Sequence, residues 1–127
     1  MLKSCSRFFL LACCVFLLSA CGKDTPEKAT MEWMDSIAAG DFQRATELSS
    51  PTAAPLIGFM EMAAMSMSAA EREEAFAQFS GPEHVSTRID GDRAEVVMRV
   101  DGVEDSIDMI RIDGQWLVDI NKDNMDK

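Results

Sequence analysis

The chain has 127 residues, with 22 Asp and Glu against 12 Lys and Arg, so its net charge at pH 7 is −10. This acidic balance excludes a nucleic-acid partner, because proteins that bind nucleic acid need a basic surface to neutralise the phosphates. It also disfavours electrostatic docking on anionic lipid. The length fits one domain with a modest core.

The first segment, MLKSCSRFFLLACCVFLLSACGKD, has the pattern of an export signal. Two basic residues precede an apolar run, 8–20, which is shorter than the roughly 20 residues that a membrane-spanning helix needs. The run ends in LSAC, residues 18–21, which resembles the lipobox of bacterial lipoproteins. We therefore expect residues 1–20 to be removed as a signal peptide and Cys21 to be acylated. The alternative is an ordinary signal peptide with a chance cysteine.

The lipobox resemblance implies a cell-envelope protein that is held on its membrane by the lipid on Cys21. In a Gram-negative host that place is the periplasmic face of the outer membrane, and otherwise it is the outer face of the plasma membrane. Residues 21–25 would form a short tether, 26–121 a single domain and 122–127 a frayed tail. The other three cysteines lie within the signal, so the mature protein has no disulfide and its fold depends on its core.

Helical patterns begin directly after the tether. Thr25-Pro26-Glu27 is typical of a helix start, since it combines a capping hydroxyl, a proline in the first turn and an acid near the positive end of the helix dipole. Ala29, Trp33 and Ile37 then form an apolar stripe at helical spacing. Gly40 is placed to end this helix, and Asp41 is placed to cap a second, shorter one.

Two further helices are expected before the pattern changes. The third helix is predicted from about Ala53 to Ser66. Residues 68–71 form a capping box, which predicts a new helix or a bend that runs to Phe79. We expect one apolar line along this region to face the core: Leu56, Phe59, Ala63, Met67 and Ala70. Gly81-Pro82 ends the helical half of the chain.

From His84 onward the apolar residues alternate with polar ones, as in half-buried strands. Three Asp-Gly pairs, at 90–91, 101–102 and 113–114, supply the positive φ angles that tight hairpins need. The third strand is irregular, and a bulge near Met109 or burial of both faces would explain it. These patterns predict an α+β fold, with the N-terminal helices packed on the apolar face of a four-stranded antiparallel meander.

Two stretches carry a resemblance to a known family. TPEKATMEWMDSIAAGDFQRATELSS, with its Gly40-Asp41-Phe42 corner, and the closing hairpin IRIDGQWLVDI resemble small nuclear-transport-factor-2-like (cystatin-like) bacterial lipoproteins of a domain-of-unknown-function family. The resemblance implies a cone-like domain whose curved sheet partly wraps a pocket. It implies no activity.

Four methionines fall in the run FMEMAAMSMSAA, residues 59–70. Thioethers are soft ligands that prefer Cu(I), but a trigonal site needs three sulfurs that converge. A helix turns about 100° per residue, which brings Met62 and Met65 within about 60° of each other and leaves Met60 and Met67 on roughly the opposite side. We interpret the run as adaptable packing or pocket lining, with copper handling by Met62 and Met65 as an alternative.

Catalytic features are sparse. The chain has no tyrosine, and its single histidine, His84, falls on the polar side of the first strand. Asp108 and Asp119 are expected to pair with arginines across an outer sheet face, not to act as bases. The tail DINKDNMDK imitates the start of a calcium loop but lacks its glycine and its distal acid.

The sequence therefore favours a non-catalytic binding or accessory module for a small apolar ligand or an envelope protein, without a cofactor or a metal. The residues expected to line its pocket are Trp33, Phe59, Met62, Met65, Phe76 and Trp116. A small isomerase- or dehydratase-like enzyme is the alternative, and it requires an acid or His84 inside the cone.

Overall fold

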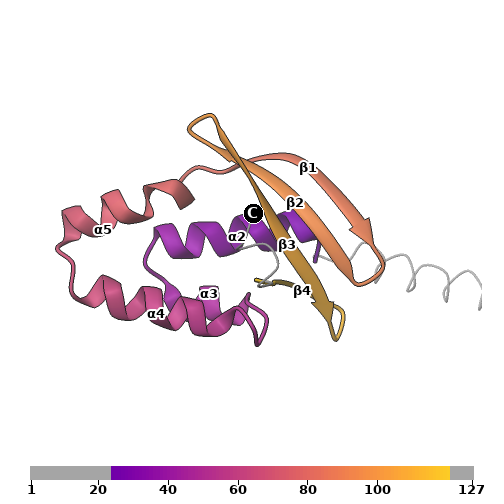
Figure 1. Ribbon diagram of the computed structural model, residues 1–127, viewed down its shortest axis with the longest axis horizontal. Helices are drawn as coiled ribbons and strands as arrows, with labels where there is room; N and C mark the ends of the chain where they lie inside the picture. Colours follow the sequence, from indigo (N-terminus) through magenta and orange to yellow (C-terminus); the bar gives the residue numbers. More distant parts are fainter. Residues whose placement is uncertain (1–23, 121–127) are drawn as a thin grey trace, which may run out of the picture.

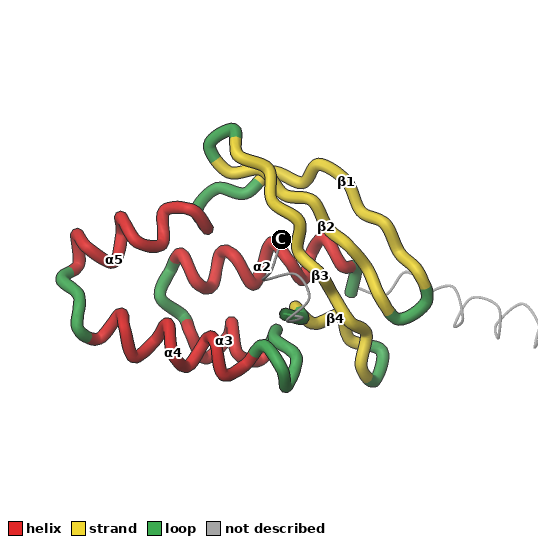
Figure 2. Tube along the Cα trace, viewed as in Figure 1, coloured by secondary structure: helices red, strands yellow, loops and turns green. Residues whose placement is uncertain are grey.

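The computed structural model describes residues 24–120 of the chain. Helices come first and a sheet follows, which confirms the predicted α+β class (Figures 1 and 2). The elements in chain order are α2 (Pro26–Ala38), α3 (Phe42–Glu47), α4 (Ala54–Met65), α5 (Ala69–Phe76), the 3₁₀ turn η1 (Ala77–Phe79), β1 (Glu83–Asp90), β2 (Arg93–Val100), β3 (Val103–Ile112) and β4 (Gln115–Val118).

The predicted helix starts are confirmed by their caps. The Thr25 side chain accepts a hydrogen bond from the backbone N–H of Lys28 at the start of α2, and Asp41 does the same for Arg44 in α3. Ser68 and Glu71 form both bonds of a capping box at the start of α5. These short-range bonds satisfy N–H groups that have no partner within the helix, so the sequence defines the helix starts locally.

The four strands form an antiparallel sheet in the order β1-β2-β3-β4, as the sequence predicts. Two of the three Asp-Gly turns have positive φ at both residues, with 50° and 79° at Asp101-Gly102 and 52° and 77° at Asp113-Gly114. Such turns match the twist of the strands that they join.

The bulge lies in a different strand from the one expected. The β2–β3 ladder runs without a break through Met109, whereas the β1–β2 register shifts between His84 and Ser86. In β3, Met109 is buried on one face and Ile110 is half-buried on the other. Burial on both faces, not an extra residue, therefore accounts for the irregular pattern of β3.

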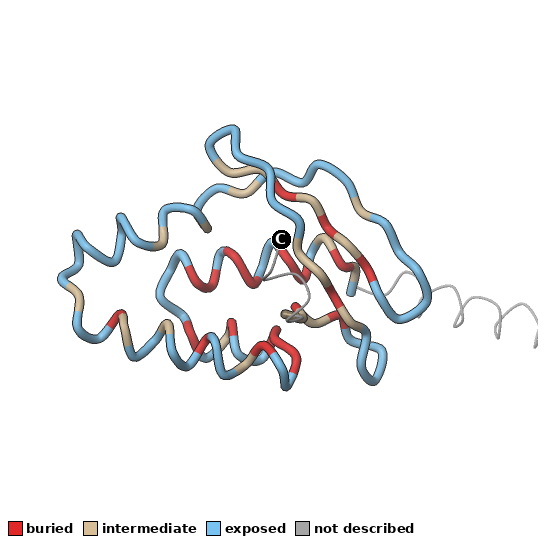
Figure 3. Tube along the Cα trace, viewed as in Figure 1, coloured by how far each residue is buried: buried red, intermediate tan, exposed pale blue. Residues whose placement is uncertain are grey.

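The core lies between α2 and one face of the sheet (Figure 3). Helix α2 packs against β1, β2 and β4, and the segment after α3 joins the sheet edge through backbone bonds between Leu48, Ser50 and Val118. The face of the sheet that α2 covers is called the inner face below. Its buried residues are Ala94, Val96, Met98, Met109, Trp116 and Val118.

Helices α4 and α5 extend beyond the sheet (Figure 1). Helix α4 packs on α3 and buries only Ile57 and Ala64, while α5 has no buried residue. The buried line on α4 therefore differs from the predicted line through Leu56 and Phe59, whose side chains are 42% and 68% exposed.

No helix within residues 24–120 is both long enough and apolar enough to cross a bilayer. The predictions for the signal peptide, for Cys21 and for the tail 122–127 lie outside the described residues.

Candidate functional site

A cavity of about 560 Å³ lies between α2, η1 and the inner face of β2 and β3; it is called the sheet cavity below. Three nearly buried side chains, Trp33, Met34 and Met98, form its deep end. The remaining lining residues come from η1 and from the β2–β3 hairpin: Ala77, Gln78, Phe79, Val100, Asp101, Val103, Asp105 and Ile107. A concave, mostly apolar space with a few polar groups is the usual form of a small-molecule site.

Trp33 is held in place from two sides. Its indole Nε1–H donates a 3.0 Å hydrogen bond to Ser49 Oγ, and its ring meets Phe79 edge-on at 5.8 Å between centroids. The hydrogen bond satisfies the indole N–H, so the rest of the ring is free to present apolar surface. The deep end of the cavity is thus a preformed apolar wall.

The open end of the cavity is acidic. Asp105 is opposite Met98 in the β2–β3 ladder, so its side chain is on the inner face, and Asp101 lies in the hairpin turn. Both residues are exposed, and one Asp105 oxygen accepts a 2.9 Å bond from the backbone N–H of Ser106. Among the described residues, no ion pair includes either acid, and no Lys, Arg or His lines the cavity.

The outer face of the sheet carries charges of both signs. Asp108 is directly opposite Glu95 and lines a shallow cleft of about 190 Å³ with Arg88 and Arg93. Partial burial raises the pKa of the Asp108 carboxyl, repulsion by Glu95 and Asp119 raises it further, and attraction to Arg93 lowers it. Asp119 itself bonds Arg93 at 2.8 Å and accepts from the Ser50 hydroxyl at 2.7 Å. The expected pairing with an arginine is confirmed for Asp119, whereas Asp108 lies opposite an acid and forms no ion pair among the described residues.

His84 is on the inner side of the sheet, not on the polar side. The bulge at Val85 places His84 opposite the buried Met98. Its ring nitrogen is 2.6 Å from the Thr87 hydroxyl, which lies 3.4 Å from the Glu27 carboxylate of α2. The ring is exposed and is not part of the cavity lining. An extra residue in a strand reverses the alternation of side chains beyond it, which explains the difference.

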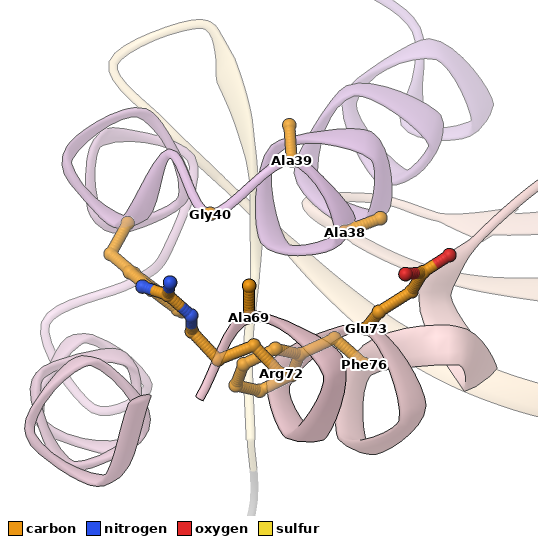
Figure 4. Close-up of a pocket in the computed structure, with 8 residues that line it drawn as sticks. Ala38, Ala39, Gly40, Ala69, Arg72, Glu73 and Phe76 are labelled. Atoms are coloured by element: carbon orange, nitrogen blue, oxygen red, sulfur yellow. The ribbon is translucent and has the colours of Figure 1, made fainter. Parts of the chain in front are cut away.

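The six residues expected to line the pocket are dispersed. Trp33 lies in the sheet cavity, whereas Trp116 is in the core, where its backbone N–H donates to Asp24 at 2.7 Å and Arg111 lies 5.1 Å from its ring. Phe76 is half-buried in a second cleft, of about 370 Å³, between the end of α2 and α5. Figure 4 shows Ala38, Ala39 and Gly40 on one side of this cleft and the residues of α5 on the other.

Phe59, Met62 and Met65 do not line the sheet cavity. Their exposed fractions are 68%, 67% and 81%, because α4 packs on α3 through the face that holds Ile57 and Ala64. At about 100° per residue, Phe59 and Met62 lie on the opposite side of the helix. A copper site at Met62 and Met65 would therefore be at the surface. The part of the chain that the structure describes holds no group of three or more His, Cys, Asp or Glu residues placed to bind a metal ion.

Asp101 and Asp105 were not identified as candidates from the sequence, although a signal for Asp105 exists. A two-residue turn at Asp101-Gly102 pairs Val100 with Val103 and therefore Met98 with Asp105. Counting outward from the turn places Asp105 on the face of Met98, and that face is apolar.

Comparison of the chain with protein-family models gave no match, and comparison with curated protein sequences gave none either. Among solved structures, the chain is similar to a crystal structure from Campylobacter jejuni that is named "Putative NTF2-like transpeptidase". The TM-score is 0.57 at 14% identity, and the match covers 77% of this chain and 100% of the other. At this identity the likeness concerns the fold alone, and the protein has a nuclear-transport-factor-2-like fold.

Proposed function

We propose that the protein is a non-catalytic module that binds a small apolar molecule in the sheet cavity. The observation that supports this proposal is the preformed wall of Trp33, Met34 and Met98 in an open space of about 560 Å³. Apolar ligands gain about 25 cal/mol for each Å² that leaves water, and a rigid wall adds little ordering cost. The proposed lipid anchor on Cys21 would place this site at the cell envelope.

The proposal can be tested by titrating the full-length protein with hexanol. The protein is purified as its bacterial host processes it and reconstituted in lipid nanodiscs, and a titration of empty nanodiscs is subtracted. Two isoleucines of β3 give a matched pair of variants: Ile107 lines the cavity on the inner face, and Ile110 is half-buried on the outer face. Ile107→Trp fills the cavity, and Ile110→Trp is the control.

We expect saturable hexanol binding by the parent and by Ile110→Trp, and loss of that binding in Ile107→Trp. Circular dichroism shows whether each variant is folded, since an added ring in a packed region costs about 1–3 kcal/mol. An absence of saturable binding by the parent, or an equal affinity in the two folded variants, would contradict the proposal.

A specific observation favours a second candidate, an isomerase- or dehydratase-like enzyme. Asp105 supplies a carboxylate on the inner face, which is the feature that this alternative requires. A general base must lie within hydrogen-bonding distance of the proton that it removes. A substrate that packs on the apolar wall would lie beside the Asp105 carboxylate. The base-promoted ring opening of 5-nitrobenzisoxazole is a generic test. A rate for the parent well above that of Asp105→Asn would support catalysis, and equal rates would count against it.

A further inference from the structure

We propose that the ligand of the sheet cavity is an amphiphilic cation, an apolar body that carries an amine or quaternary ammonium group. This inference depends on the proposed function and adds the charge of the ligand. It follows from the distribution of polarity within the cavity, which is apolar at the deep end and acidic at the open end.

The charged residues at the opening of the cavity set the sign of the ligand's charge. Among the residues that the structure describes, Asp101 and Asp105 are the only charged ones that line the sheet cavity. Two carboxylates at one opening attract a cation and repel a fatty-acid-like anion. The chain as a whole is acidic as well, with a net charge of −10 at pH 7.

The arginine that neighbours these two acids does not neutralise them. The nearest arginine along β2, Arg99, is opposite Glu104 on the outer face and is held there by Glu104 at 2.5 Å and by Glu83 at 4.0 Å. Strand alternation keeps that guanidinium on the other side of the sheet from Asp105. Within residues 24–120, neither acid therefore forms an ion pair, and no basic residue lines the cavity beside them.

The two ends of the cavity set the orientation of the ligand. A cationic head that contacts the exposed carboxylates remains hydrated, because Asp101 and Asp105 are exposed. The attached apolar body then extends toward Trp33 and Met98, which are 6% and 1% exposed. This placement buries apolar surface without the cost of burying an unpaired charge. An amphiphilic cation uses both ends of the cavity, whereas a neutral molecule uses only one.

Three probes with the same six-carbon chain test the charge: hexyltrimethylammonium, hexanol and hexanoate. They are titrated into the full-length protein in nanodiscs, as described above. Because the acids are exposed, we expect a modest preference, with the cation bound about fivefold more tightly than the alcohol and the anion bound most weakly. The preference should decrease when salt is raised, while the affinity for hexanol stays constant.

Two variants test whether the preference for the cation comes from these acids. One is the single variant Asp105→Asn, and the other is the double variant that combines Asp101→Asn with Asp105→Asn. Asp113→Asn is a matched control for Asp101, because both residues precede a glycine in a hairpin turn, with φ of 52° and 50°. We expect the control to keep the preference for the cation and the double variant to bind cation and alcohol equally well.

The outcomes separate the two proposals. Equal affinity of the parent for cation and alcohol overturns the charge assignment and leaves the proposed function intact. A preference that survives in the double variant also overturns it, since the charge then acts from elsewhere. Failure of all three probes to bind the parent overturns both proposals.

Discussion

Met98 and Asp105 are partners across the β2–β3 ladder and share the inner face of the sheet. Met98 is 1% exposed, whereas Asp105 is exposed, so one cross-strand pair connects the apolar end of the cavity to its open end. A carboxylate can be next to a core methionine because this end of the hairpin is in contact with water: Val103, two residues before Asp105, is 70% exposed. The pair explains how one ladder supplies both an apolar wall and a charged rim.

Two methionines provide a matched test of the core. Met98→Ala should lower the free energy of unfolding by about 3 kcal/mol, because it removes a fully buried side chain and leaves a cavity. Met62→Ala should change it by less than about 0.5 kcal/mol, because Met62 is 67% exposed on α4. Urea unfolding of both variants measures the difference. Similar losses in the two variants would mean that α4 packs more tightly than the structure indicates.

The hydrogen bond from Trp33 to Ser49 is expected to stabilise the wall of the cavity. Trp33→Phe and Ser49→Ala each remove one partner, and the double-mutant cycle should give a coupling of about 1 kcal/mol in the free energy of unfolding. In a control cycle, Trp116→Phe replaces Trp33→Phe and is combined with Ser49→Ala. No coupling is expected there, because no side-chain bond joins Trp116 to Ser49 in the described chain. Additive effects of the Trp33 and Ser49 variants would show that this bond contributes nothing to stability.

Local signals made much of the fold predictable. The caps at Thr25, Asp41 and Ser68 and the Asp-Gly turns act over three or four residues, and each is where the sequence places it. The meander follows from the turns, since a two-residue connection can only join antiparallel neighbours. The packed face of α4 was not predictable in this way. Apolar residues surround that helix, so periodicity cannot select the side that packs on α3.

The residues that line the cavity could not be predicted from single positions in the sequence. Val85 forms a bulge that no glycine or proline marks, and this extra residue changes the face of His84. Phe76 and Trp116 are large and apolar like Trp33, but one lies against α2 and the other fills the core. Composition and spacing identify which residues are apolar, whereas tertiary packing decides which of them surround an open space.

Asp108 should make stability depend on pH in the acidic range. Its pKa is above the usual 3.8 in the folded protein, so the folded state favours the protonated form. The contribution of this group to stability is therefore greatest below the unfolded-state pKa and is lost as pH rises through the folded-state pKa. Asp108→Asn, which mimics the protonated form, should stabilise the protein at pH 7 by less than about 1 kcal/mol, since the group is largely hydrated.

Thermal unfolding at several pH values checks this expectation. The gain from Asp108→Asn should shrink as pH falls through the raised pKa of the folded state, because the parent carboxyl then becomes protonated itself. Glu95→Gln should give a gain of the same sign at pH 7, because it removes the opposite carboxylate. A loss of stability in Asp108→Asn at pH 7 would show that the ionised carboxylate makes favourable contacts that outweigh the repulsion.

The proposed lipid anchor predicts a change in location from one substitution. In a bacterial host, the parent should fractionate with membranes and incorporate labelled palmitate, because two or three acyl chains bind far more firmly than one. Cys21→Ser removes the only thiol in the LSAC motif and should abolish the label. Cys14→Ser, within the apolar run, is the control and should keep it. Incorporation of palmitate into Cys21→Ser would place the lipid on another residue, and an unlabelled parent would indicate an ordinary signal peptide.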